Sequence, residues 1–453
     1  MIGFVRWVAV LAISVRLLGG VGEAGAGDAP SMIRDAEIEA VLRAYATPLF
    51  QAAGIAPDSV KIHIVNDRSL NAFVANGLHL FVHSGLLTRA ENAGQVIGVL
   101  AHETGHIAGG HLVSLRDEIS AAQTQSMIAA LLGAATGIAA KRGDVGAAVT
   151  MGAQEMIKRN FFSYSRGHEQ AADQAAMRFL DATGQSPKGM VDFFDILGDQ
   201  EALLNGGKDP YTRTHPLTRD RIEFAHHQLQ VSRHADAPTR PEFEEMNRRM
   251  RAKLFAFMEP PVRTLSRYKE GDASVEARYA RAIAFYKKAD LKNALPLIDG
   301  LIAASPQDPY FVELKGQMLF ENARLKEAAE AYRVATALLP GNSLVETSLA
   351  QVLIELDDPA LLPEANRHLK LALTHEPDNA FAWRLMSIGH GRSGDMGMAS
   401  YAMGEHALLA GKPEEALYHA ERALKLLPKT SPVLLRARDI KDAAEDMRKK
   451  SKG

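Results

Sequence analysis

The sequence predicts a mostly α-helical chain with a small β-sheet in its first half and an array of helix pairs in its second half. Three observations support this fold class. Residues 59–83 contain alternating apolar and polar runs and the dipeptide Asn76-Gly77, which is typical of a β-hairpin. His102 and His106 stand four residues apart in a mostly apolar segment, the spacing of neighbours on one helix face. From about Ser274 onward, prolines and small residues recur with the period of a helix pair.

Length and composition limit the possible classes of protein. A chain of 453 residues is too long for one hydrophobic core and predicts two or three domains. The absence of cysteine excludes disulfides, thiol nucleophiles and thiolate metal ligands, so His, Asp and Glu remain as ligands. The net charge of -2 gives no general reason to expect nucleic acid as a partner.

The N-terminus has the features of an export signal. Arg6 precedes the mostly apolar run 7–15, and residues 24–26 (Ala-Gly-Ala) offer a small-x-small cleavage site. Arg16 interrupts the apolar stretch, and so short a run does not easily span a bilayer. We therefore expect residues 1–26 to be a cleaved signal peptide, and no later segment reaches transmembrane length.

A strand at 59–64 and the hairpin at 71–83 precede the helix that carries the two histidines. Thr88 and Glu91 have the spacing of a capping box, which predicts that this helix begins there. The strand just before the helix has two interpretations. Its edge accepts an extended peptide as an added strand, or it only completes a small sheet.

Residues 102–106 form the pattern H-E-x-x-H, in which His102 and His106 can supply two corners of a tetrahedral zinc site. Glu103 follows the first histidine and is placed to accept a proton from an attacking water. A third histidine ligand at position 112 is excluded, because that residue is Leu112. The neighbouring His111 has the wrong helical phase for the same metal, so we expect it to be structural or to hydrogen-bond near the helix end.

A later alanine-rich helix, predicted over 166–182 and ended by Gly184, offers the third ligand. Glu169 is the candidate, and Asp173 lies one turn further along the same face, where it can accept the N–H of a ligand histidine. The surrounding alanines allow two helices to approach closely, as a shared metal requires. These residues predict a zincin-like catalytic domain that binds one Zn2+ per chain.

His215 lies in a loop at 211–216, before another predicted helix. A zinc peptidase needs a donor for the oxyanion that forms when water attacks the carbonyl. His215 is a candidate for this catalytic role, or for occupying the open zinc position in a resting enzyme. Tyr211, Arg219 and Arg221 are the other candidate donors.

Residues 119–158 are rich in Ala, Gly and Met, and residues 127–140 carry no charge. The uncharged stretch is too short to span a bilayer and too rich in alanine to be a strand. We expect a pair of packed helices here. A mobile lid or a membrane-surface element near the site is the alternative.

Pro306 and Pro340 stand 34 residues apart, the tetratricopeptide spacing, and small or aromatic residues recur at fixed distances before each proline. The longer gap to Pro377 indicates an insertion around 361–363, and the gap from there to Pro428 indicates an extra helix. The array is expected to be a stacked-helix solenoid with a concave surface. We divide the chain into four parts: signal peptide 1–26, metallopeptidase domain 27–240, connecting helix 241–262 and tetratricopeptide-repeat domain 263–453.

Residues 102–106 (His-Glu-Thr-Gly-His) and 165–173 (Ser-Arg-Gly-His-Glu-Gln-Ala-Ala-Asp) resemble the H-E-x-x-H plus E-x-x-A-D pattern of a known metallopeptidase family. This is the family that contains the CAAX prenyl proteases and the heat-shock protease HtpX. Residues 71–87 resemble its strand motif, and residues 214–216 resemble its later histidine loop. The resemblance implies zinc held by His102, His106 and Glu169, Glu103 as general base, and His215 as a regulatory fourth ligand.

An export signal, this catalytic domain and C-terminal repeats together are similar to a periplasmic branch of that family, which degrades or helps to assemble outer-membrane barrel proteins. The similarity implies a periplasmic zinc endopeptidase that acts on unfolded or misassembled outer-membrane proteins. Its repeats would dock substrate or the barrel-assembly machinery, with peripheral membrane association. The alternative is a chaperone or assembly adaptor whose metal site is structural or silent.

Overall fold

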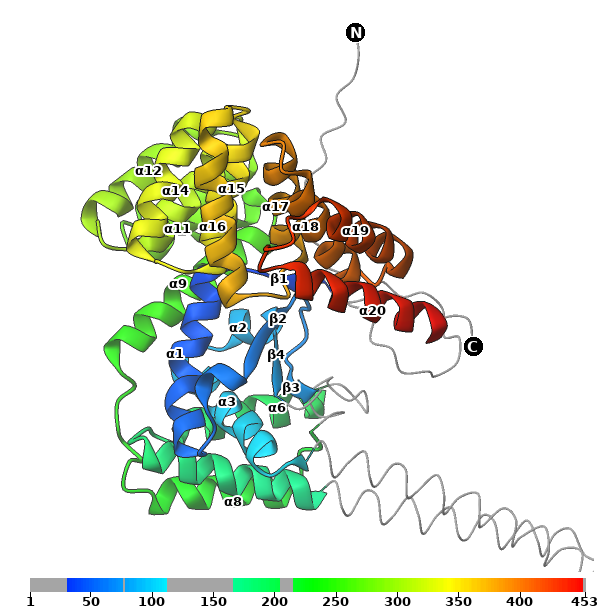
Figure 1. Cartoon of the computed structure of the whole chain (residues 1–453). Coiled ribbons are helices and arrows are strands. Elements are labelled where there is room, and N and C mark those ends of the chain that lie inside the picture. The colour runs from blue at the N-terminus through cyan, green and yellow to red at the C-terminus, as the bar shows by residue number, and fades with distance from the viewer. Residues whose placement is uncertain (1–30, 76–77, 112–165, 204–214, 451–453) are drawn as a thin grey trace, which may run out of the picture. The chain divides into compact units, whose positions relative to one another are not determined.

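The computed structural model describes residues 31–75, 78–111, 166–203 and 215–450 (Figure 1). These residues form two compact units, which divide between Phe255 and Ala256. The expected signal peptide, the segment 119–158 and Asn76-Gly77 lie outside the described residues. Within the described ranges, no helix is both long enough and apolar enough to cross a membrane.

The first unit contains a four-stranded mixed sheet with the order β1-β2-β4-β3. Strands β3 and β4 pair antiparallel, which confirms the predicted hairpin. Strand β2 pairs with β4 in parallel, so it is not part of a simple meander, and the short strand β1 was not predicted. Strand β3 lies at one edge of the sheet. The strand bounds are Met32–Ile33 for β1, Lys61–Val65 for β2, Ala72–Ala75 for β3 and His79–His83 for β4.

The helix that carries the two histidines begins later than the sequence predicts. A short helix α2 (Ser84–Arg89) ends first, and the Thr88 hydroxyl donates to the Ser84 carbonyl inside it instead of capping the next helix. Helix α3 (Ala93–Ala108) is capped by Asn92, whose side chain accepts the N–H of Gln95. The capping-box prediction is therefore wrong, because a local turn uses the Thr88 hydroxyl.

Helices surround α3 in the first unit. A Cβ at Gly189 would lie 2.1 Å from the carbonyl carbon of Gly94, so the backbones at the starts of α3 and α6 are in direct contact. The helix at 166–182 is present as predicted and is followed by Gly184 at a φ of +68°. The other elements of this part are α1 (Ala36–Ala52), η1 (Pro57–Ser59), α6 (Lys188–Leu203), α8 (Arg219–Val231) and α9 (Pro241–Met258).

The second unit consists of stacked helix pairs, coloured from green through yellow to red in Figure 1. The short 3-10 helix η2 (Pro359–Leu361) lies at the predicted insertion, and the helices between residues 380 and 426 account for the extra helix before Pro428. The mostly helical fold class is confirmed. The helices are α10 (Pro261–Arg267), α11 (Val275–Lys287), α12 (Leu291–Ala304), α13 (Pro309–Glu321), α14 (Leu325–Leu338), α15 (Ser343–Glu355), α16 (Leu362–His375), α17 (Ala380–Arg392), α18 (Met396–Leu409), α19 (Pro413–Leu426) and α20 (Leu434–Lys450).

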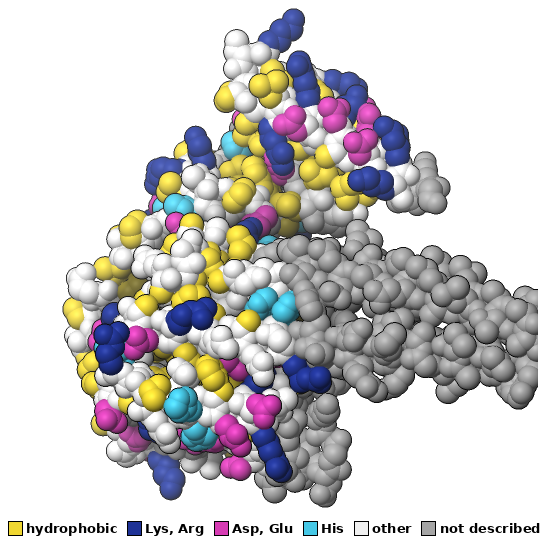
Figure 2. Space-filling view, turned by 90° about the horizontal axis from the view of Figure 1, so that it is seen from below, with side chains coloured by type: hydrophobic (Ala, Val, Ile, Leu, Met, Phe, Trp, Pro, Cys, Tyr) yellow, Lys and Arg dark blue, Asp and Glu magenta, His cyan; other side chains and the backbone are white. Residues whose placement is uncertain are grey.

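Charged side chains of both signs lie on the face of the described residues that Figure 2 shows. On the face drawn in Figure 2, basic and acidic side chains alternate, with small groups of hydrophobic side chains between them. No continuous field of one sign covers the described residues of this face. The charged groups that bear on chemistry are instead buried in the first unit.

Candidate metal centre

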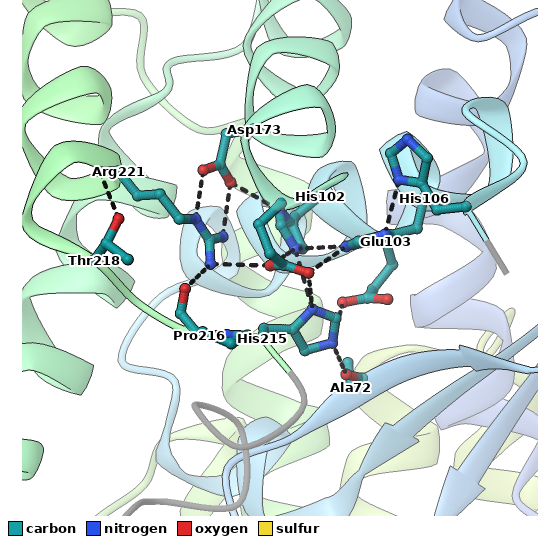
Figure 3. A network of polar contacts seen from close by, with 11 residues as sticks. Ala72, His102, Glu103, His106, Asp173, His215, Pro216, Thr218 and Arg221 are labelled. Atoms are coloured by element: carbon teal, nitrogen blue, oxygen red, sulfur yellow. Dashed lines mark hydrogen bonds and ion pairs between the residues drawn. The ribbon is translucent and has the colours of Figure 1, made fainter. Parts of the chain in front are cut away.

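The centre forms where α3 crosses the helix at 166–182. A Cβ at Gly105 would lie 2.7 Å from the Ala172 carbonyl oxygen, so the two helix backbones meet with no room for a side chain. This is the close approach that the alanine-rich sequence predicts. It brings His102 and His106 from one helix to Glu169 from the other. Figure 3 shows the two histidines beside His215.

Four side chains converge on one point: His102, His106, Glu169 and His215. The Nε2 atoms of His102 and His106 are 3.1 Å apart, and His106 Nε2 lies 3.3 Å from Glu169 Oε1. His215 Nδ1 lies 3.4 Å from His102 Nε2 and 3.3 Å from the same Glu169 oxygen. Donors bound to one tetrahedral zinc at the usual bond lengths are separated by about 3.3 Å. The four donors therefore fit the corners of a single zinc site.

Asp173 contacts His102 on the side away from the other donors, and Arg221 in turn pairs with Asp173. His102 Nδ1 lies 2.9 Å from Asp173 Oδ1, and Arg221 makes a bidentate pair with the same carboxylate at 2.7 and 2.9 Å. All three side chains are almost completely buried. Burial lowers the pKa of His102, but its hydrogen bonds to Asp173 and Glu169 outweigh this and raise the pKa to about 9.

The two carboxylates of the centre remain ionised. Burial raises the pKa of Glu169, but hydrogen bonds from His102, His106 and His215 outweigh burial and hold that pKa well below its usual value. Burial also raises the pKa of Asp173, and His102 and Arg221 reverse that effect, so its pKa is lowered. Buried anions of this kind require cationic partners, which agrees with a metal-binding site.

Glu103 differs from the other carboxylates. Its side chain is fully buried, yet neither oxygen has a hydrogen-bond partner among the described residues. His215 Nε2 lies 3.5 Å from Glu103 Oε1. Burial raises the pKa of Glu103, although the charge of His215 opposes it. A buried carboxylate with free lone pairs beside four metal-type donors is placed to exchange a proton with a water or substrate.

The structure brings His215 into the centre from a loop far along the sequence. Its Nδ1 faces the other donors, and its Nε2 lies 3.2 Å from the carbonyl oxygen of Ala72 on the edge strand β3. Arg221 holds this loop through a hydrogen bond of 2.8 Å to the Pro216 carbonyl oxygen. Thr218 caps the following helix α8.

Three residues at or beside the centre have contacts that the sequence did not predict. Arg221 was considered as an oxyanion donor, but the structure pairs it with Asp173 and with Glu169, 2.9 Å away. The ring of His168, the residue before Glu169, stacks on the ring of His111 with centroids 4.2 Å apart. Ala72 contributes only a backbone carbonyl, which no side-chain pattern reveals. Of the other candidate donors, Arg219 is exposed and Tyr211 lies outside the described residues.

Fold and site together define a metallopeptidase. Residues 33–229 match Peptidase family M48, and residues 274–343 match the tetratricopeptide repeat. The chain therefore contains an M48 metallopeptidase domain, with a candidate H-E-x-x-H plus Glu zinc site, and C-terminal tetratricopeptide repeats.

The chain is similar over most of its length to proteins named beta-barrel assembly-enhancing protease. It is 25% identical over 364 residues to the protein of Yersinia pestis, which covers 78% of this chain and 72% of that protein. It is 22% identical over 400 residues to the protein of Escherichia coli (strain K12), covering 86% and 79% of the two chains. It is also 30% identical over 171 residues to the metalloprotease YcaL of Escherichia coli (strain K12), covering 37% of this chain and 60% of that protein.

Proposed function

We propose that the chain is a periplasmic zinc endopeptidase that hydrolyses peptide bonds of misfolded or stalled outer-membrane proteins. The convergence of His102, His106 and Glu169 beside the buried Glu103 carries this proposal. The relatives that match most of the chain are named for beta-barrel assembly, which supports barrel proteins as substrates. The export signal expected at the N-terminus supports the periplasm as the compartment. Residues 1–26 would direct export. The repeats would dock substrate or the barrel-assembly machinery and give the protein an assembly-chaperone role as well.

His102, His106 and Glu169 are the proposed ligands of one Zn2+ per chain. When bound, zinc supplies Lewis acidity that polarises a peptide carbonyl and lowers the pKa of water. Asp173 accepts the Nδ1–H of His102, at 2.9 Å, and so keeps Nε2 of that ring free for the metal.

Glu103 is the proposed general base. It takes the proton of the attacking water and returns it to the leaving amine, as the same group must do in both halves of the reaction. The raised pKa of Glu103 favours holding that proton between the two steps. Neither of its oxygens accepts a hydrogen bond from the described residues, so no existing hydrogen bond has to break.

His215 is the proposed fourth ligand of the resting site. Its Nδ1 lies at the fourth corner, and its Nε2 donates to the Ala72 carbonyl on the edge strand β3. An extended peptide that adds to this edge needs the same kind of backbone acceptor. Displacement of His215 would therefore free the metal and the strand edge together, which favours the resting-ligand role over that of oxyanion donor.

Cleavage assays on the purified full-length chain test the proposal. We expect slow cleavage of an unfolded outer-membrane barrel protein that stops when a zinc chelator is added. Glu103→Gln should lower the rate by about 10^2- to 10^4-fold. Glu223 is an exposed glutamate on α8, so Glu223→Gln is the matched control and should cleave the substrate at the wild-type rate. Cleavage that survives both chelation and Glu103→Gln would refute the proposed mechanism.

A second readout separates the peptidase from the assembly adaptor. The Glu103→Gln protein should bind the unfolded barrel protein and leave it intact. If the wild-type chain binds zinc but never cleaves a barrel protein, while promoting its assembly, the adaptor function is correct.

A further inference from the structure

The two histidines of α3 have different partners on the side away from the converging donor atoms. His102 Nδ1 faces the Asp173 carboxylate at 2.9 Å. His106 Nδ1 instead faces an imidazole nitrogen: it lies 3.0 Å from Nδ1 of His111. His111 is not one of the four converging residues.

The hydrogen bond between His106 and His111 has one direction if His106 binds metal. Its Nε2 is the atom that faces the other donors, 3.1 Å from His102 Nε2 and 3.3 Å from Glu169 Oε1. A lone pair on Nε2 leaves the proton of a neutral imidazole on Nδ1. His106 Nδ1–H then donates to His111 Nδ1, so the proton of His111 is on its Nε2.

The backbone at the end of α3 is built to turn His111 back toward His106. Gly110 has a φ of +61°, which reverses the chain after Gly109. A Cβ at Gly109 would lie 2.2 Å from His111 Nε2, so only a glycine leaves room for the ring. His168, the residue before the ligand Glu169, stacks on the same ring with an interplanar angle of 13°. The ring of His111 therefore lies between Gly109, His106 and His168.

We propose that His111 is a positioning residue, whose Nδ1 lone pair fixes the tautomer and ring orientation of His106 for zinc. The proposal rests on the proposed zinc site. It assigns to His111 the part that Asp173 plays for His102, with a neutral acceptor in place of an anion. Outer partners of ligand histidines orient the ring, and their loss typically weakens metal binding by about 10- to 100-fold.

Zinc affinity of the full-length protein, measured by competition with a chromophoric chelator, tests this role. His111→Phe keeps a flat ring for stacking but removes the acceptor, and should weaken zinc binding by about 10- to 100-fold. His111→Gln offers an amide oxygen as acceptor and should recover most of that loss. His227→Phe, which changes an exposed histidine on α8, is the matched control and should leave affinity unchanged.

A backbone variant tests the same contact independently. Gly109→Ala should also weaken zinc binding, because the methyl group displaces the His111 ring. Its effect should not add to that of His111→Phe, since both remove one hydrogen bond. The visible spectrum of Co2+ bound to either variant should differ from the wild-type spectrum, whereas the unfolding temperature of the repeat unit should not change.

Three results would overturn the inference. Wild-type zinc affinity and an unchanged Co2+ spectrum in His111→Phe would show that the acceptor has no role. Equal losses in His111→Phe and His111→Gln would show that only the shape of the ring matters. Failure of the wild-type chain itself to bind zinc would overturn the proposed function along with this inference. This outcome can be told apart from the first two because it is seen in the wild-type protein.

Discussion

Two arginine–carboxylate pairs in this protein have nearly the same geometry and different surroundings. In the metallopeptidase unit, Arg221 contacts Asp173 through two bonds of 2.7 and 2.9 Å, with side-chain exposures of 1% and 0%. In the repeat unit, Arg333 of α14 contacts Glu364 of α16 through two bonds of 2.8 and 2.9 Å, with exposures of 42% and 23%. From bond lengths alone, the two pairs would be expected to contribute equally to the stability of the protein.

Burial makes the difference. Water screens the pair in the repeat unit and would solvate either partner if the other were removed. In the metallopeptidase unit, removal of one partner leaves an uncompensated charge in the protein interior. Arg221 also contacts Glu169 and the Pro216 carbonyl, so it joins the helix at 166–182 to the His215 loop. The buried pair thus belongs to the site, whereas the exposed pair only joins two neighbouring helices.

The largest expected effect is that of Arg221→Met. It leaves Asp173 buried without its guanidinium partner, which should reduce the free energy of unfolding of the metallopeptidase unit by about 3–5 kcal/mol. Calorimetry on the full chain measures this, because the two units are expected to give separate transitions. A change below about 1 kcal/mol would show that water reaches the pair and that the comparison is wrong.

The next effect is that of Asp173→Asn on the metal. The amide oxygen still accepts from His102, but the negative charge that holds Arg221 and increases the basicity of His102 is lost. We expect zinc affinity to fall by about 10- to 100-fold, measured by chelator competition. Asp195→Asn, in an exposed pair with His226, is the matched control and should bind zinc like the wild type. Unchanged zinc affinity in Asp173→Asn would show that the Asp173 charge has no role in metal binding.

Acid should reduce the contribution of the buried Arg221–Asp173 pair to the free energy of unfolding. The pKa of Asp173 is lowered in the folded state, so its stabilisation is fully present above the unfolded value of about 3.9 and is lost as pH falls through the folded pKa. The stability difference between wild type and Arg221→Met, measured on chelator-treated protein, should be constant from pH 7 to 5. Below about pH 4 it should narrow by up to about 1.4 kcal/mol per pH unit. A difference that widens in acid would contradict the lowered pKa.

The smallest expected effect is that of Arg333→Met. The exposed pair should contribute less than about 1 kcal/mol to the stability of the repeat unit. That contribution should disappear in about 1 M salt, where screening acts over roughly 3 Å. The Arg221→Met effect should persist under the same conditions. If both effects have the same size and salt dependence, burial does not distinguish the two pairs.

The parts of the fold that follow from local pattern were predictable. The hairpin, the helix at 166–182 and the helix pairs around Pro306 and Pro340 each arise from the spacing of neighbouring residues, and the structure contains all of them. The start of α3 was predicted wrongly because two overlapping capping signals compete there. Asn92 caps the helix, while the Thr88 hydroxyl is used within α2.

Partners across long distances in the chain were harder to predict. The carboxylate helix could be found because Glu169 and Asp173 share one face amid alanines. The partner of Arg221 could not be found, because 48 residues separate it from Asp173 and no periodicity links them. The contact from His215 to Ala72 spans 143 residues and uses a backbone atom.

The sequence by itself determined the chemistry that this protein can carry. The i, i+4 histidines, a nearby glutamate, a second acidic helix and the absence of cysteine restrict the metal donors to His and carboxylate, and the proline period determines the repeat array. Only the tertiary structure decided which donors face inward, which charges are buried with a partner, and that His215 and His111 reach His102 and His106. The physical reason is that side-chain periodicity describes one element at a time, whereas burial and ion pairing arise where elements meet.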